Sequence, residues 1–281
     1  MKAMNNINFY LVNKKSDNLI MEKLAKTCNG KTFKENKYRK GLSVCFGLNS
    51  KILNKCIKDN LPYVYLDKSV LFNTKERVGR MRVGINKIHN AIPIKRPSDR
   101  FESLSINQSE WRTTGNHILI CPPTDEGYTK HGIWRNSSYT ILNIQPAWLE
   151  LTIRKIRQVS DRKIIIRPKK WNRRYDKIVA AIKNVEASVD RSLAKDFEDC
   201  WATVAPSSGV SILGLINGIP SFCEPDKLAS SCSLSDYSKI ESPLYCDRSK
   251  LLNHLSYLDF SIEEIESGIA WDIIEKSITE I

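Results

Sequence analysis

The chain has 281 residues, of which 41% are hydrophobic, and a net charge of +13. This apolar content fits one large α/β domain or two small ones. The positive charge predicts attraction to phosphate-rich or otherwise acidic partners. The alternative is a solvated basic surface without a partner. The sequence shows no charged-then-apolar leader and no apolar run near the ~18 residues that cross a bilayer, so we expect a cytoplasmic protein without a membrane partner.

The first part of the chain alternates apolar runs with amphipathic segments. Strands are expected at 7–12, 42–47 and 62–67, helices at 16–27 and 48–60, and a basic loop at 29–40. Residues 73–115 lack clear periodicity and are expected to be irregular, with a short strand near 80–85, and to lead into a domain linker. Strand–helix–strand at this spacing favours a parallel sheet with crossover helices.

A second alternation begins at residue 117. Strands are expected at 117–123, 163–170 and 201–205, and helices at 145–159, 177–186, 192–200, 247–258 and 261–278. The pattern predicts two α/β halves, with a first lobe at 1–115 and a second lobe at 116–281 that includes the closing helices.

The segment WATVAPSSGVSILGLINGIPSF (201–222) is the most informative. A buried strand is followed by Ser207 and Ser208 in the N-cap position of a helix, and Gly209 would let a ligand approach the backbone. Gly218 is placed to end that helix, and Pro220 prevents its continuation. Free N–H groups and serine hydroxyls at a helix start predict an anion site, whereas the simpler interpretation is that a serine only caps the helix.

This segment, with the preceding SLAKDFEDC, resembles the donor-site signature of GT-B glycosyltransferases over residues 192–223. The resemblance implies two Rossmann-like lobes facing a cleft, an acceptor-side first lobe, and a second lobe that binds a nucleotide-sugar co-substrate, UDP-linked in our expectation. It implies no other cofactor, and the chain has no DxD-type metal motif. The segments 240–271 and 80–86 resemble phage-encoded glycosyltransferase-like proteins, which implies a hydroxymethylated pyrimidine of double-stranded DNA as acceptor, in the cytoplasm of the host cell.

Further donor-binding residues are expected where strands of the second lobe end, because ligands of open α/β sheets bind there. Arg167 and Lys169 follow the strand KIIIRP and would hold phosphate oxygens. Thr124 and Asp125 follow HILICPP and would face the donor. The alternative is that both segments are ordinary surface turns.

Asp67 ends the strand PYVYLD of the first lobe and is our expected catalytic base, taking the proton of the attacking hydroxyl. It could instead cap the following turn. His89 and His131 are the alternative bases, although a lone histidine is more often structural.

A basic stretch of the first lobe is the expected DNA-binding surface, or else an ordinary basic surface. Its members are Arg77, Arg80, Arg82, Lys95, Arg96 and Arg100. The alternatives to a DNA-modifying enzyme are a glycosyltransferase acting on a surface polysaccharide or small acceptor, a non-enzymatic nucleic-acid-binding protein of the same fold, and a nucleotide-sugar epimerase.

The eight cysteines form no CxxC pair, and most lie in apolar segments. This pattern indicates small buried hydrophobic residues in a reducing compartment instead of a disulfide framework or a metal site.

Overall fold

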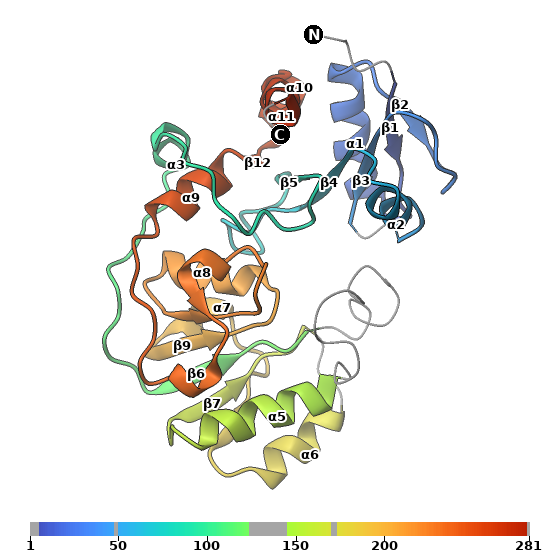
Figure 1. Ribbon diagram of the computed structural model, residues 1–281. Helices are drawn as coiled ribbons and strands as arrows, with labels where there is room; N and C mark the ends of the chain where they lie inside the picture. Colours follow the sequence, from blue (N-terminus) through green and yellow to red (C-terminus); the bar gives the residue numbers. More distant parts are fainter. Residues whose placement is uncertain (1–5, 48–49, 124–144, 170–172, 280–281) are drawn as a thin grey trace. The chain divides into compact units, whose positions relative to one another are not determined.

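The computed structural model describes residues 6–47, 50–123, 145–169 and 173–279, which form two compact units (Figure 1). Unit 1 comprises Met1–Asn90, Lys95–Leu104 and Asn253–Ile281, and unit 2 comprises Ala91–Ile94 and Ser105–Leu252. Each unit is built on a six-stranded sheet. None of the described helices combines the length and the apolar character needed to cross a membrane.

The sheet of unit 1 has the strand order β12-β5-β4-β3-β1-β2. Strands β1 to β4 are parallel, β5 runs antiparallel to β4, and β12 runs antiparallel to β5. The strands are β1 (Ile7–Tyr10), β2 (Lys31–Phe33), β3 (Leu42–Phe46), β4 (Tyr63–Lys68), β5 (Met81–Ile85) and β12 (Asp259–Phe260). The helices are α1 (Lys15–Thr27), α2 (Ser50–Lys58), α3 (Asp99–Ser103), α10 (Ile262–Glu266) and α11 (Ile269–Thr279), and α9 (Ser249–Ser256) begins in unit 2 and ends in unit 1.

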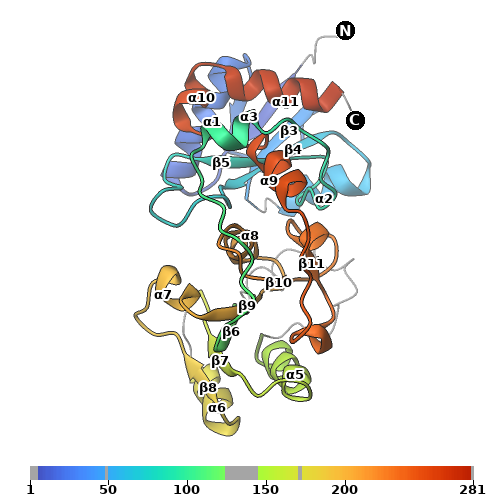
Figure 2. The ribbon, with the colours of Figure 1, turned by 90° about the vertical axis from the view of Figure 1, so that its left-hand side faces the viewer.

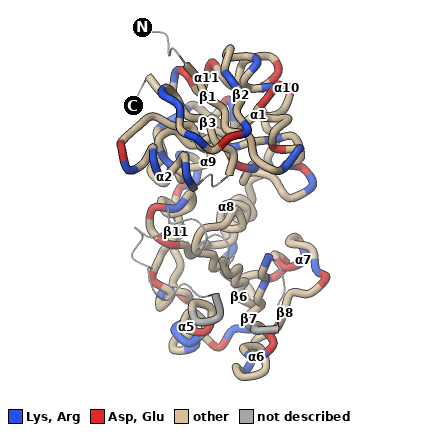
Figure 3. The backbone as a smooth tube through the Cα atoms, turned by 90° about the vertical axis from the view of Figure 1, so that its right-hand side faces the viewer, with Lys and Arg blue, Asp and Glu red and all other residues tan. Residues whose placement is uncertain are grey.

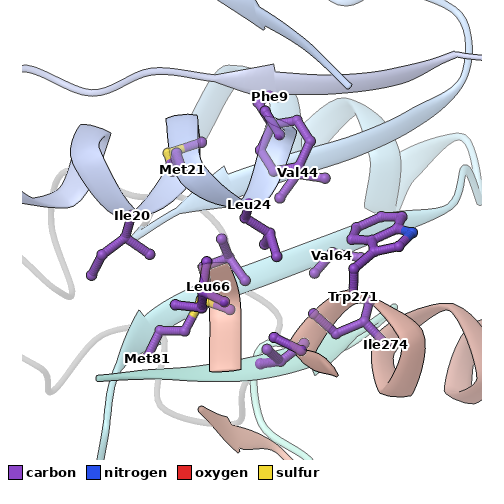
Figure 4. Close-up of a cluster of buried hydrophobic side chains, with 14 of the residues drawn as sticks. Phe9, Ile20, Met21, Leu24, Val44, Val64, Leu66, Met81, Trp271 and Ile274 are labelled. Carbon is purple, nitrogen blue, oxygen red and sulfur yellow. The ribbon is translucent and has the colours of Figure 1, made fainter. Parts of the chain in front are cut away.

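One face of this sheet is covered by α1 and α11 (Figure 4). Alternate side chains of β1 point to opposite faces, and Phe9 joins Val44 and Leu24 in the cluster between the sheet and these helices. Trp271 of α11 lies against Phe9, with ring centroids 6.4 Å apart. A sheet buried in this way requires apolar side chains at successive positions, which explains the nearly continuous apolar runs in the sequence.

The carboxyl-terminal segment belongs to unit 1, not to the second lobe in which the sequence division at residue 115 placed it. Strand β12 pairs with β5, with Phe260 opposite Met81, and α10 and α11 pack beside α1. Ile265 and Trp271 are buried in the unit 1 core. The apolar faces of these last helices therefore complete the first sheet, and the boundary between the units falls within α9.

Unit 2 has the strand order β11-β10-β9-β6-β7-β8, and all its strands are parallel. This is the order of a doubly wound dinucleotide-binding sheet, in which the chain first builds outward on one side and then on the other. The strands are β6 (His117–Ile120), β7 (Lys163–Ile166), β8 (Val185–Ala187), β9 (Cys200–Val204), β10 (Ser221–Phe222) and β11 (Ser233–Leu234). The helices are α5 (Gln145–Arg157), α6 (Arg173–Ala181), α7 (Leu193–Phe197), α8 (Gly209–Ile216), and the short 3₁₀ turns η2 (Ser230–Cys232) and η3 (Tyr237–Lys239).

Helices cover both faces of the unit 2 sheet, with α5 on one side and α7 on the other (Figure 2). Ile118 and Ile120 of β6 pack with Leu149 of α5. Leu119, between them, points to the opposite face and packs with Phe197 of α7. The predicted class, α/β with two Rossmann-like, mostly parallel sheets, is confirmed.

Several predicted elements differ from the structure, and the expected closing helix at 261–278 is divided at Gly268 into α10 and α11. The expected helix at 177–186 ends at Ala181, and Val185 begins strand β8, because its side chain is buried beside β7. The expected basic loop at 29–40 contains the edge strand β2. Both short strands lie at sheet edges, where a sequence has too few alternating positions to reveal them.

All eight cysteines are free thiols, and six of them are buried, as the sequence pattern indicated. Burial raises the pKa of Cys121 and Cys200 to about 12. These thiols therefore stay protonated at neutral pH and pack as small hydrophobic side chains.

Candidate functional site in unit 2

The carboxyl ends of β6 and β9 form the topological switch point of the second sheet. From β6 the chain moves toward β7 and β8, and from β9 it moves the opposite way, toward β10 and β11. The connections after β6 and β9 therefore leave on opposite faces, and a crevice opens between them in folds of this class. The segment Pro206–Gly209 follows β9 at this point.

Helix α8 begins at this switch point with the predicted cap. Ser208 has an extended backbone, and its hydroxyl accepts a hydrogen bond from the amide of Val210 at 3.2 Å. The first turn of α8 contains no acidic residue. Since α8 spans eight residues, its amino end concentrates positive partial charge beside Ser207, Ser208 and Gly209. Helix ends of this kind attract anions.

The other end of α8 confirms the predicted stop. Gly218 has a φ of +73°, and its amide donates to the carbonyl of Leu215 at 3.2 Å. A Cβ at this position would lie 1.9 Å from the carbonyl oxygen of Glu110, so only glycine fits. The close packing of Gly218 against Glu110 holds the carboxyl end of α8 in place. It thereby sets the direction of the helix axis and of the amides at Ser208 and Gly209.

Arg167 lies at the carboxyl end of β7, as predicted, but its guanidinium is tied into an internal network. Its Nη1 donates to Asp196 Oδ2 at 2.5 Å and to Ser188 Oγ at 3.0 Å. Arg191 forms a second ion pair with Asp196, at 3.2 Å. The carboxylate is fully buried, whereas the side chains of Arg167 and Arg191 are 27% and 33% exposed. Two guanidiniums thus share one carboxylate, which leaves excess positive charge at this edge of the sheet.

A pocket that the sequence analysis did not identify adjoins the switch point. It has a volume of about 280 Å³ and is lined by Cys223, Glu224, Pro225, Asp226, Ser230, Ser233 and Ser235. The Glu224 amide donates to the carbonyl of Pro206 at 3.1 Å, which places the pocket next to the start of α8. Glu224 is 2% exposed. Burial lowers the pKa of Lys227, whereas the nearby carboxylates of Glu224 and Asp226 act to raise it.

A signal for this pocket was present in the sequence. Glu224 and Asp226 follow the apolar run Ile219–Phe222, so the rule that ligands bind beyond strand ends also applies to them. Strand β10 has only two residues, and a run this short has too few alternating positions to predict a strand. The carboxylates and hydroxyls of the pocket are suited to accept hydrogen bonds from the hydroxyls of a sugar.

Asp67 lies at the end of β4 in unit 1, and both of its carboxylate oxygens have partners. Oδ1 accepts from the amide of Lys68 at 2.8 Å. Oδ2 accepts from Arg82 at 2.9 Å and from the hydroxyl of Tyr65 at 3.0 Å. The carboxylate is 38% exposed, so one side of it faces solvent. His89 is half-buried, and His131 lies outside the described residues.

Three of the arginines expected to face DNA are held inside unit 1. Arg80 pairs with the buried Asp259 at 2.9 Å, Arg82 with Asp67, and Arg100 with Glu264 at 2.8 Å. The exposed fractions of these arginine side chains are 15%, 8% and 15%. Their guanidiniums therefore act as internal counter-ions, and the structure does not bring the six predicted residues together on one surface.

The other expected site residues are in part exposed and in part undescribed. Lys95 and Lys169 are exposed, and Arg96 lies over the ring of Tyr257 at 5.4 Å. Thr124 and Asp125 lie outside the described residues. Lysines and arginines occur throughout both units with acidic residues among them (Figure 3).

Among the described residues, no three His, Cys, Asp or Glu side chains are grouped closely enough to hold a metal ion.

Comparison with solved structures relates this fold to sugar-transferring proteins of Thermosulfurimonas dismutans. A KpsC structure, the beta Kdo 2,7 transferase, aligns with 95% of this chain and 99% of its own at a TM-score of 0.56 and 12% identity. The KpsC beta Kdo 2,4 transferase aligns with 98% of this chain and 99% of its own at a TM-score of 0.52 and 11% identity. No family model and no curated protein sequence matches the chain. At these identities the likeness establishes the fold.

Proposed function

We propose that the protein is a glycosyltransferase that moves a sugar from a nucleotide-sugar donor to an acceptor hydroxyl. The observation that carries the proposal is the start of α8: a Ser-Ser-Gly turn at the switch point of a dinucleotide-type sheet, with no carboxylate in the first turn. A diphosphate placed there would accept hydrogen bonds from backbone amides at the start of α8 and be stabilised by the helix dipole. The two similar structures, both Kdo transferases, support the reaction class.

The remaining polar groups of unit 2 have places in this proposal. The pocket at Glu224 and Asp226 would take hydroxyl groups of the donor, because it lies beside Pro206 at the foot of α8. Arg167 and Lys169 would add positive charge near the diphosphate. In the reaction, the acceptor oxygen forms a bond to the anomeric carbon and the bond from that carbon to the phosphate oxygen breaks. The amides of α8 would stabilise the charge on the departing nucleoside diphosphate.

Asp67 is our proposal for the base that removes the acceptor proton. Its partly exposed carboxylate supports this role, although Arg82 and Tyr65 also bind it. Asp67→Asn should abolish transfer while leaving UDP binding unchanged. Normal transfer by this variant would remove Asp67 from the mechanism.

The acceptor expected from the sequence is hydroxymethylated DNA, and the structure does not favour it. Arg80, Arg82 and Arg100 are engaged in internal ion pairs, which removes half of the proposed DNA contacts. We therefore propose an acceptor among saccharides and small molecules, with duplex DNA as an arm of the test. Purified protein is incubated with nucleotide sugars, including activated Kdo, and with anionic oligosaccharides or hydroxymethylated duplex DNA. Mass gain on the DNA would overturn our choice of acceptor.

A matched pair of substitutions tests the donor site itself. Gly209 is the first residue of α8, and Gly209→Asp would place a carboxylate at the helix start, where it stabilises the helix but repels a diphosphate. Gly209→Asn has nearly the same shape without the charge. UDP binding, measured by calorimetry, should be much weaker in the Asp variant than in the Asn variant, because both add a side chain at Gly209 and only Asp adds a negative charge. Equal UDP affinity for both variants would mean that no diphosphate binds at α8.

A further inference from the structure

Positive charge is concentrated in two segments of unit 1 that the proposed donor site does not use. Residues 31–40 and 50–60 contain eight lysines and arginines and two acidic residues, and so hold six of the thirteen net positive charges of the chain. The carboxylates of Glu35 and Asp59 each pair with one of these cations, at 3.5 and 2.6 Å. We call the eight cations the basic surface. Six of them are exposed and form no ion pair with another described residue, namely Lys31, Lys34, Lys37, Lys40, Lys51 and Lys58.

The two segments pack side by side on one face of the unit 1 sheet. Segment 34–40 leads from β2 toward β3, and its Arg39 amide donates to the hydroxyl of Tyr10 at 2.8 Å. Tyr10 points away from α1, because its neighbours on β1 belong to the cluster under that helix. Helix α2 covers the same face, opposite α11 (Figure 2), and Lys55 Nζ lies 5.3 Å from the ring centroid of Tyr38. The basic segment 34–40 therefore lies directly beside α2.

The lysines of α2 form a line on the solvent side of the helix. Lys51, Lys55 and Lys58 recur at the spacing i, i+4, i+7, which places them on one face. With a rise of 1.5 Å per residue, they extend over ~10 Å along the helix. The apolar face of α2 is turned inward, and its buried residues are Ile52, Leu53 and Cys56.

The chemistry of the basic surface fits an acidic polysaccharide better than a nucleic acid or a membrane. Arg39 lies over the ring of Phe33 at 4.1 Å and Lys55 over that of Tyr38, so cations already cover ring faces on which bases would stack. Because α2 keeps its apolar face in the core, it cannot insert that face into a bilayer. The exposed polar residues among the lysines can donate to and accept from sugar hydroxyls, and they include Thr32, Asn54 and Asn60.

The basic surface lies on the side of the sheet toward which Asp67 points. Val64 and Leu66 of β4 belong to the cluster under α1, so Tyr65 and Asp67, which alternate with them, face the other side. The hydrogen bond of 3.0 Å from the Tyr65 hydroxyl to Asp67 agrees with this. Helix α2 follows β3, the strand that pairs with β4. A polymer bound along α2 therefore approaches the edge of the sheet at which Asp67 lies.

We propose that the basic surface binds an acidic polysaccharide through the carboxylates of successive sugars. Each exposed ion pair contributes little, but several pairs on one polymer act together. The interaction surface stands on the charge and the packing of the two segments. That the bound polysaccharide is the acceptor of sugar transfer rests on the proposed function.

Titration with a labelled polymer tests the surface without any need for activity. The full chain is added to end-labelled oligogalacturonate, a chain of carboxylate-bearing sugars, and binding is followed by fluorescence anisotropy, with a labelled neutral maltooligosaccharide as reference. We expect oligogalacturonate to bind with an affinity that falls as salt is raised, and the neutral chain not to bind. If oligogalacturonate does not bind at low salt, or the neutral chain binds equally well, the proposal is overturned.

Competition identifies the class of polyanion. It is carried out at physiological ionic strength, where contacts made by charge alone are weakened. Unlabelled oligogalacturonate should displace the label at a lower concentration of anionic groups than duplex DNA or phosphatidylglycerol vesicles. The reverse order for DNA or for vesicles would overturn the choice of a polysaccharide.

Matched triple variants locate the binding surface. Changing Lys51, Lys55 and Lys58 to glutamine should weaken oligogalacturonate binding about tenfold, the combined effect of three exposed ion pairs. A second variant changes Lys34, Lys37 and Lys40 in the same way and should also bind more weakly, and thermal unfolding verifies that each variant is folded. Native affinity in both variants would overturn the assignment to this face. The control variant loses the same charge from other helices and should keep native affinity, with glutamine at Lys155 of α5, Lys177 of α6 and Lys276 of α11.

Kinetics separate the surface from its part in the proposed reaction. With a donor that the protein uses, the α2 variant should raise the KM for an acidic oligosaccharide acceptor about tenfold and leave the KM for the donor unchanged. If the variant loses oligogalacturonate binding but this KM does not change, the surface stands and its assignment to the acceptor is overturned. If no sugar is transferred to any acceptor, the proposed function and the acceptor role are both overturned, and the titration still decides the surface.

Discussion

Asp196→Asn should lower the stability of unit 2 sharply, because Asp196 is the shared counter-ion of two arginines. Its fully buried carboxylate pairs with Arg167 at 2.5 Å and with Arg191 at 3.2 Å, and it also accepts a hydrogen bond from Ser188. Asparagine keeps the shape of the side chain and one acceptor oxygen. The substitution therefore removes the charge and leaves two guanidiniums beside each other without their anion.

The size of the effect follows from burial. Removing one partner of a buried ion pair costs about 3 to 5 kcal/mol in the free energy of unfolding. The side chains of Arg167 and Arg191 are 27% and 33% exposed, so water screens them in part and we expect the lower limit, about 3 kcal/mol. For a unit of this size, that corresponds to a fall in Tm of about 6 to 12 °C.

Thermal unfolding followed by circular dichroism measures this change, with Asp199→Asn as the matched control. Asp199 is exposed, lies three residues further along, and has a φ of 52°, which asparagine tolerates. The control alters the net charge equally and should leave the Tm almost unchanged. If Asp196→Asn unfolds within about 2 °C of the control, the arginines do not depend on Asp196 and the network does not stabilise the edge of the sheet.

Two further predictions concern the backbone and pH. Gly218→Ala should destabilise the protein by about 3 kcal/mol or more in urea unfolding, because the added Cβ would overlap the Glu110 carbonyl. Gly268→Ala, also at positive φ but in open space, should cost only about 1 kcal/mol. Equal losses of stability in the two variants would contradict the steric explanation. Burial raises the pKa of Asp259 to about 6, above its unfolded value of 3.8, so its contribution to stability is present below pH 4 and is lost as the pH rises through 6. Asp259→Asn should flatten the pH dependence of unfolding between pH 4 and 7, and an unchanged slope would assign that dependence to other groups.

The start of α8 and the network at Asp196 contribute differently to the proposed reaction: the first would contact the donor directly, and the second would act at a distance. Arg167 was expected to hold phosphate, and its Nη1 is instead committed to Ser188 and Asp196. An arginine fixed in this way contributes through its charge and through the rigidity that it gives to the ends of β7 and β8. Ser208 and Gly209, by contrast, present backbone amides directly at the switch point, which is why the donor experiment is directed at α8.

The sequence by itself determined the local elements whose signals are short-range. The N-cap at Ser208, the positive-φ stop at Gly218 and the Rossmann-like alternation of strands and helices follow from backbone geometry and side-chain periodicity within a few residues. The buried cysteines follow from their apolar neighbours. Each of these features depends on atoms close together along the chain, so it could be predicted without the rest of the fold.

Only the tertiary structure decided which residues meet across long separations. Arg80 was expected to face DNA, but it pairs with Asp259, 179 residues away, because the last strand returns to the first sheet. The same return moves α10 and α11 into unit 1. The pocket at Glu224 likewise depends on residues that the sequence separates, since Glu224 and Ser233 line it together. Charge and composition do not predict such pairings, because the residue type of a lysine or arginine does not tell whether its side chain is exposed or forms an internal ion pair. Only the packing of the folded chain decides between the two.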